Sequence, residues 1–355
     1  MQSNGEWQSF LRESGASLAD TVIQDFGNAD LERKRTRDAD ILTDLSQLSL
    51  IRIEGEDAGS FLQGQFSNDI QLVTETHSQL SAYSSAQGRM FAIFRVFMSG
   101  GGYFLQLPSA LVETIVKRLR MFVLRAKVRI EAADAEWVRI GVSGPNVDAI
   151  LTDAAIALPE QVDGCLAQGD LITLRLPGPW PRFEVLGRID AMKVLWTRLR
   201  SRLTPVGSGA WSWLDIVAGI PTILPATVEA FVPQMANLDI LGGINFKKGC
   251  YPGQEIVARM HYLGRLKQRM VRASVDVADK PAPGTTIYAP DFVGQSAGTV
   301  VDAQPGPEKG FDLLAVVQLS SVKGGELHLA TADGPLLRLI ELPYSLEQKS
   351  ESAVG

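Results

Sequence analysis

The chain has 355 residues, of which 45% are hydrophobic and 21% charged, and a net charge of −6 at pH 7. This length and composition predict two or three domains with hydrophobic cores, and they exclude a single small module, a disordered chain and a coiled coil. The acidic balance argues against broad nucleic-acid binding by the whole surface. The chain has only two cysteines, no apolar run near the ~20 residues of a membrane helix, and no targeting pattern. We therefore predict a protein of the reducing bacterial cytoplasm that does not contact the membrane.

Two similar units follow one another along the first 209 residues. Residues 1–43 are polar and charge-rich, which predicts a leader that packs on the body of the protein. From Leu48 the pattern becomes strand-like in LIRIEG and leads into a stripe of apolar residues at helical spacing. WVRIGVSG leads into a similar stripe later in the chain. We predict a duplicated α+β unit with antiparallel sheets, the first domain at 44–132 and the second at 133–209. The alternative is a chance alternation of apolar residues.

The last part of the chain has the pattern of a small β domain. Short β runs are separated by PAPG, PGPEKG, KGG and DG, which predicts an antiparallel barrel over 266–345. Residues 346–355 are polar and predict a frayed tail. Residues 210–265 are assigned to the first domain. The predicted fold class is therefore α+β, a duplicated unit plus a C-terminal β-barrel.

The most informative stretch is 247–272, called the basic segment below, with seven cations and one acid. A helix is predicted over 254–262, so Cys250 should lie just before its N-terminus. Two preceding lysines and the positive end of the helix should lower the pKa of the Cys250 thiol. The alternatives are a small buried cysteine and, for the cations, a solvated face. Cys165 has no comparable cations beside it and is expected in the core.

The centre of the basic segment carries a family resemblance. It consists of Lys248, Gly249, Cys250, Tyr251, Pro252, Gly253, Gln254 and Glu255. This core resembles the signature of the YgfZ-type folate-binding proteins, relatives of the glycine-cleavage T-protein. The likeness covers nearly the whole chain, with FLQGQFSNDI at 61–70, QGRMF at 87–91, WSWLDIVAGIP at 211–221, FVPQMANLDILGG at 231–243 and LPYSLE near the end. It implies three domains in a ring around a folate-sized hole.

The resemblance also implies a function. The ligand would be tetrahydrofolate, also in its polyglutamylated form, and the role would be iron-sulfur cluster assembly or repair that supports enzymes such as tRNA methylthiotransferases. Cys250 would be a redox thiol, a nucleophile or a transient cluster ligand, with Lys248 beside it, and no other metal site is expected. Trp211 matches an aromatic residue that contacts folate, and the alternative for this residue is a tryptophan of the core. Arg259 and Arg265 would pair with the carboxylates of the folate tail.

The chain departs from the transferase branch of this superfamily. T-proteins carry a catalytic acid pair after the glycines aligned with Gly88, where this chain has Phe91 and Ala92, and Val217 replaces the glutamate that holds the pterin. Leu48 falls where relatives place a second aromatic residue. Without the acids, aminomethyl transfer lacks an evident means of orienting the folate amines. A folate-dependent C1 transferase or demethylase, and an RNA- or protein-docking module that uses the basic segment, are the alternative functions.

Overall fold

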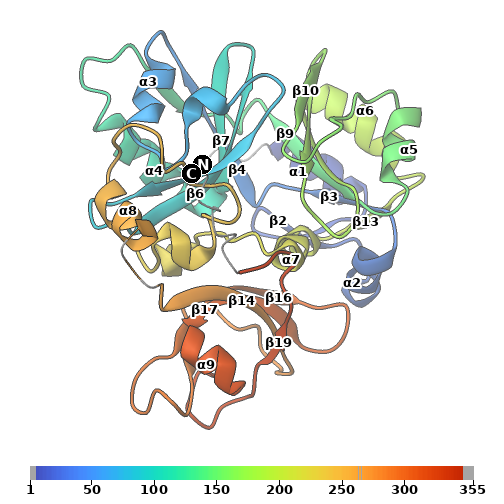
Figure 1. Cartoon of the computed structure of the whole chain (residues 1–355). Coiled ribbons are helices and arrows are strands. Elements are labelled where there is room, and N and C mark those ends of the chain that lie inside the picture. Colours follow the sequence, from blue (N-terminus) through green and yellow to red (C-terminus); the bar gives the residue numbers. More distant parts are fainter. Residues whose placement is uncertain (1–4, 263, 265, 347–355) are drawn as a thin grey trace.

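The protein is divided into three lobes around helix α7 (Ser208–Ala218), which lies near the middle of the molecule (Figure 1). The computed structural model describes residues 5–262, 264 and 266–346. Two lobes combine a sheet with helices, and the third is mainly a curled sheet. The predicted α+β class is confirmed. Within the described ranges, no helix is both long and apolar enough to cross a membrane.

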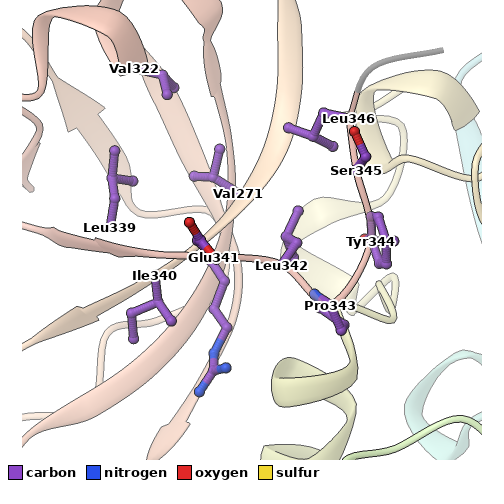
Figure 2. A pocket seen from close by; sticks show the side chains of 11 residues that line it. Val271, Val322, Leu339, Ile340, Glu341, Leu342, Pro343, Tyr344, Ser345 and Leu346 are labelled. Atoms are coloured by element: carbon purple, nitrogen blue, oxygen red, sulfur yellow. The ribbon is translucent and has the colours of Figure 1, made fainter. Parts of the chain in front are cut away.

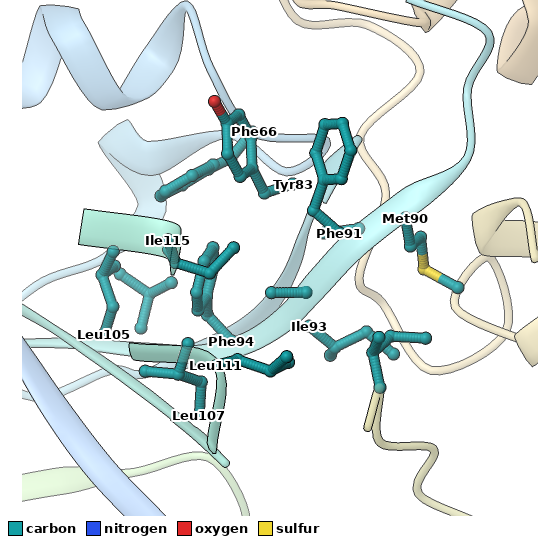
Figure 3. Packing of buried hydrophobic residues seen from close by; sticks show 14 of the residues in the cluster. Phe66, Tyr83, Met90, Phe91, Ile93, Phe94, Leu105, Leu107, Leu111 and Ile115 are labelled. Atoms are coloured by element: carbon teal, nitrogen blue, oxygen red, sulfur yellow. The ribbon is translucent and has the colours of Figure 1, made fainter. Parts of the chain in front are cut away.

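The first lobe is a five-stranded antiparallel sheet with two helices. Its spatial order is β5-β6-β7-β4-β8. The elements are β4 (Leu48–Glu54), α3 (Ala58–Gln63), β5 (Gln79–Ser84), β6 (Met90–Ser99), β7 (Gly102–Pro108), α4 (Val112–Arg120) and β8 (Arg129–Ala132). Gly100 and Gly101 form the tight turn between β6 and β7 at φ of 58° and 73°, where glycine is favoured. Side chains such as Phe66, Phe94 and Ile115 fill the core (Figure 3).

The second lobe repeats this plan. Its six-stranded sheet has the order β10-β11-β12-β9-β3-β13. The elements that follow the first lobe are β9 (Val138–Ser143), α5 (Val147–Asp153), β10 (Cys165–Gln168), β11 (Leu171–Leu176), β12 (Arg182–Gly187), α6 (Ile189–Leu199) and β13 (Thr204–Val206). Both lobes have the chain order strand, helix, three strands, helix, strand, and their first four sheet positions correspond. The arrangement is that of a duplicated unit.

The N-terminal segment completes the second lobe. Its elements are α1 (Gly5–Glu13), β1 (Ser17–Ala19), β2 (Val22–Asp25), α2 (Ala29–Asp38) and β3 (Ile41–Asp44). Strand β3 pairs antiparallel with β9 and parallel with β13, while Trp7 and Leu11 are buried in the second core. The predicted boundary at residue 43 therefore lies inside a strand. The alternation seen at LIRIEG did not reveal it, because β3 pairs with residues about a hundred positions away.

The third lobe is one curled antiparallel sheet of order β18-β15-β16-β17-β14-β19. Its elements are β14 (Gln268–Val275), β15 (Thr286–Tyr288), β16 (Gly298–Pro305), β17 (Phe311–Gln318), α9 (Leu319–Gly324), β18 (His328–Leu329) and β19 (Arg338–Ile340). The sheet curls as a half-barrel (Figure 1). Val301 and Leu314 belong to the core of the first lobe, so the two lobes share buried apolar surface. Of the predicted tail, residues 347–355 lie outside the described residues.

The segment after β19 ties the third lobe to α7. It runs along a hollow of about 500 Å³ that Leu342, Pro343 and Tyr344 help to line (Figure 2). The Tyr344 hydroxyl donates a hydrogen bond of 2.7 Å to the Gly219 carbonyl at the end of α7. A Cβ at Gly219 would lie 2.7 Å from the tyrosine ring, and its φ is 66°. Glycine is therefore required at this helix end by both conformation and contact.

Candidate functional site

The residues that precede the exposed cysteine are anchored by Lys248. The chain turns at 63–68, at the end of α3, so backbone carbonyls there are not paired within a helix or a sheet. The Lys248 ammonium donates hydrogen bonds to the carbonyls of Gln63, Phe66 and Asn68, at 2.7, 2.6 and 2.9 Å. Two segments about 180 residues apart, FLQGQFSNDI and KKGCYPGQE, are thereby joined by one side chain.

This geometry gives Lys248 a structural role. The residue is 8% exposed, and burial lowers the pKa of its ammonium to about 8, with the Asp69 carboxylate opposing the shift. All three ammonium protons have carbonyl acceptors, so none is directed at a reacting group. The expectation that Lys248 acts beside the thiol is corrected: its charge points into the first lobe. The sequence could not indicate this, because the acceptors are backbone atoms of a distant turn.

Two glycines bring a further pair of motifs into contact. Gly88, in the turn before β6, and Gly253, just before α8 (Gln254–Tyr262), have φ of 71° and 81°. A Cβ at Gly253 would lie 2.5 Å from the Ser85 carbonyl oxygen and 2.6 Å from the Gly88 Cα. The backbones of QGRMF and GCYPG therefore touch directly, which only glycine permits.

We expect Gly253→Ala to lower the free energy of unfolding by roughly 2 to 4 kcal/mol, because it adds a left-handed alanine and a backbone clash. Gly249→Ala is the matched control from the same motif: no described atom lies within 4 Å of a Cβ there, and its φ is not left-handed. It should change stability by less than about 0.5 kcal/mol. Urea unfolding of both variants tests this, and equal effects would contradict it.

These contacts hold Cys250 at the surface. Helix α8 occupies the predicted residues, and its Val257 is buried against the first lobe, where the Gln234 amide donates to the Val257 carbonyl at 2.6 Å. Cys250 is exposed, whereas Cys165 on β10 is 1% exposed. Burial raises the pKa of the Cys165 thiol to about 12, with a smaller contribution from Glu75. The expected burial of Cys165 is confirmed, and the exposed position of Cys250 excludes the buried alternative.

The basic segment does not form one cationic surface. Arg269 is buried and paired with Asp239 through two contacts of 2.6 and 2.8 Å, and Arg272 pairs with Asp312 at 3.3 Å. Lys248 is also buried. The described cations that remain exposed are Lys247, Arg259 and Lys267. Arg265 lies outside the described residues. The sequence suggested more exposed positive charge than the structure has, because arginines of this segment form ion pairs with acids from other parts of the chain.

The indole of Trp211 is not an accessible stacking surface. The residue is 1% exposed, and the Arg182 guanidinium lies 3.8 Å from the ring centroid. A Cβ at Gly141 on β9 would lie 2.5 Å from the ring, so α7 packs closely on the second sheet. Folate cannot stack on Trp211 in this packing, which corrects that expectation. The physical reason is helix geometry: Trp211 is on the buried face, together with Leu214 and Ala218.

The other face of α7 borders a cavity of about 550 Å³ where the lobes meet. Ser208, Ser212 and Asp215, at helical spacing, belong to that face. Further lining comes from β2 and α2, from Gln47, Leu48 and Pro108, and from the third lobe at Lys280, Pro283, Asp302, Gln304 and Pro305. Leu48 is thus one of the residues that line the cavity. Arg259, on α8, does not line it.

The third lobe supplies polar groups that the sequence did not reveal. Asp302 is 6% exposed, and burial raises the pKa of its carboxyl, opposed mainly by Lys280. The Gln304 amide donates to both Asp302 oxygens at 3.3 and 3.2 Å, and Lys280 donates to Gln304 Oε1 at 3.0 Å. In the sequence, Asp302 stands inside the predicted β run GTVVDA, where it interrupts the alternation of apolar and polar residues. That interruption was the only available signal.

Comparison with known proteins places this fold in a class. The model of the GCVT N-terminal domain matches residues 11–161. The structure resembles the glycine cleavage system aminomethyltransferase T from Bartonella henselae, with a TM-score of 0.78 and 20% identity over 94% of this chain and 96% of that one. The protein therefore has the T-protein fold.

The sequence relatives are more specific. The tRNA-modifying protein YgfZ of Escherichia coli O7:K1 (strain IAI39) is 31% identical over 310 residues, which cover 86% of this chain and 94% of the relative. The protein of the same name from Klebsiella pneumoniae (strain 342) is 31% identical over 309 residues, which cover 86% and 93%. The chain belongs to the YgfZ family.

Proposed function

We propose that this protein binds tetrahydrofolate in the cavity between its three lobes and supports tRNA modification. The carrying observation is the cavity of about 550 Å³, which has walls from all three lobes and a volume typical of sites for ligands of this size. The fold is that of an aminomethyltransferase, and the YgfZ relatives are named for tRNA modification. Tetrahydrofolate in mono- or polyglutamylated form is the proposed ligand.

The finer part of the proposal concerns Cys250. An exposed thiol on a loop that is fixed by Lys248 and by the Gly88–Gly253 contact is presented to partners in a defined position. This arrangement suits a thiol that acts on another protein, as a redox group or a transient cluster ligand. We propose iron-sulfur enzymes that modify tRNA, such as methylthiotransferases, as those partners.

The alternative of C1 transfer has less support. Phe91 and Ala92 are buried apolar residues of β6, and Val217 packs against the apolar cluster between the lobes. These positions hold no carboxylate that could orient a folate amine or move its proton. Docking of RNA through the basic segment also has less support, because three of its cations, Lys248, Arg269 and Arg272, are committed to internal contacts.

Filling the cavity tests the folate proposal. Gly209 lines the cavity in the first turn of α7, and a Cβ there meets Gln304 Oε1 at an ordinary 3.7 Å. We expect Gly209→Leu to weaken tetrahydrofolate binding at least about tenfold, because its side chain occupies the ligand volume. Gly324→Leu, at the end of α9 where no described atom lies within 4 Å of a Cβ, is the control and should bind normally.

Calorimetric titration with tetrahydrofolate and its triglutamate measures both variants, and thermal melting checks that they fold. Normal binding by Gly209→Leu would show that the ligand does not bind in this cavity. No binding by the unmodified protein would reject folate as the ligand.

A further inference from the structure

The cavity contains one acid that is placed to recognise the flat head of a folate. A pterin presents a 2-amino group and an adjacent ring N3–H, which are two parallel donors. A carboxylate accepts such a pair through both of its oxygens, as it does from a guanidinium. Because Val217 stands at the position that the T-protein resemblance assigns to a pterin-binding glutamate, another group must supply these acceptors.

A β-bulge aims Asp302 at the cavity. The pairing of β16 with β17 shifts in register between Val300 and Asp302. Val300 and Ala303 both lie in the core of the third lobe, although they are three residues apart. The two residues between them therefore project from the opposite face: Val301 enters the first core, and Asp302 reaches the cavity lining. Bulges of this kind redirect side chains next to functional sites.

Asp302 retains unused acceptor capacity. An ionised carboxylate has about four acceptor positions. Its one short hydrogen bond comes from the Ala303 amide at 2.8 Å, and the Gln304 amide is shared between both oxygens at longer distances of 3.3 and 3.2 Å. Lys280 in turn donates a hydrogen bond to Gln304 Oε1 at 3.0 Å. A nearly buried carboxylate with such weak partners gains more from two added donors than an exposed one does.

The other acids of the lining are engaged or peripheral. Asp215 pairs with the buried Arg182 at 2.8 Å. Glu32 accepts hydrogen bonds from the backbone amides of Phe26 and Gly207 at 2.7 and 3.0 Å, and also from that of Asn28. Asp25 is only half-buried. Asp302 is thus the acid of this lining that combines burial with open acceptor positions.

We propose that Asp302 binds the 2-amino and N3–H edge of the pterin of a reduced folate, and that Gln304 and Lys280 position its carboxylate. This inference rests on the proposed folate function and adds the residue that determines specificity for the pterin. It requires no chemical step, since the contact is a pair of hydrogen bonds.

The test combines a variant with a modified ligand. Asp302→Asn keeps the size of the side chain but removes one acceptor, and Asp276→Asn, an exposed position in the same lobe, is the control. Tetrahydrofolate binding is expected to weaken roughly 10- to 100-fold in Asp302→Asn and to stay unchanged in Asp276→Asn. The 2-desamino-2-methyl analogue of tetrahydrofolate lacks the amino donor but keeps N3–H. The unmodified protein should therefore bind it more weakly than tetrahydrofolate, and the difference in affinity between the unmodified protein and Asp302→Asn should be smaller for the analogue than for tetrahydrofolate.

The possible outcomes separate the two proposals. If the unmodified protein binds tetrahydrofolate but Asp302→Asn binds it equally well, or if the analogue distinguishes the two proteins as strongly as tetrahydrofolate does, the role of Asp302 is rejected and the folate function stands. If the unmodified protein binds no folate, both fall. Thermal melting of Asp302→Asn, expected to match that of the unmodified protein, shows that a loss of binding is not a loss of folding.

Discussion

Lys248→Met is expected to lower the free energy of unfolding by about 3 kcal/mol, since three buried carbonyls each lose a hydrogen bond worth about 1 kcal/mol. Lys247→Met is the control, because the neighbouring lysine is exposed and should contribute less than about 0.5 kcal/mol. Urea unfolding of both variants gives the comparison. Equal and small effects would mean that the turn at 63–68 keeps its conformation without the ammonium.

The pH dependence provides an independent check on Lys248. Burial holds the pKa of the folded-state ammonium at about 8, against an ordinary lysine value of 10.5. Between these values the unfolded chain binds more protons than the folded protein, so the contribution of this group to the free energy of unfolding rises with pH. The difference between the unmodified protein and Lys248→Met should therefore be larger at about pH 10 than at about pH 7. A difference that shrinks over this window would contradict the burial of the charge.

The two cysteines are expected to differ by at least about 10³-fold in their rate of alkylation by iodoacetamide in the native protein at about pH 8. Cys250 is exposed, whereas Cys165 is 1% exposed. With burial raising the pKa of Cys165 to about 12, roughly 10⁻⁴ of it is thiolate at that pH, and the thiolate is the reacting form. Mass spectrometry of peptides after timed quenching measures both sites.

Unfolding in urea provides the control, because both thiols should then react at similar rates. Rapid labelling of Cys165 in the native state would show that β10 opens readily. In a strain that lacks the protein, Cys165→Ser should restore modification of tRNA by iron-sulfur enzymes and Cys250→Ser should not. Full restoration by Cys250→Ser would leave the thiol without the proposed role.

Local patterns predicted the elements of the fold well, because apolar period and turn residues act over short distances. Helix α8 at 254–262 and the β character of the third lobe both followed from such patterns. The repeated unit was visible for the same reason, since each copy carries its own strand and helix signals. The place of Cys250 before α8 required only these local rules.

Features that depend on distant partners were not predictable in this way. The composition around Lys248 indicated a cationic surface, but its acceptors are carbonyls about 180 residues earlier in the chain. The motif that contains Trp211 forms α7, but which face of α7 meets the cavity is decided by packing against Gly141. Asp302 was missed because a bulge, which no residue type specifies alone, reverses the direction of its side chain.

The placement of β3 also bears on how the chain is made. Residues 41–44 cannot pair until 140–143 have been synthesised, and β13 at 204–206 comes later still. In the sequence, the first lobe lies between β3 and β9. Its strands β4 and β8 pair with each other, which brings the start and the end of this lobe close together. On the ribosome this lobe can therefore fold as an inserted unit and shorten the loop that β3 must close, which lowers the entropic cost of that late, long-range pairing.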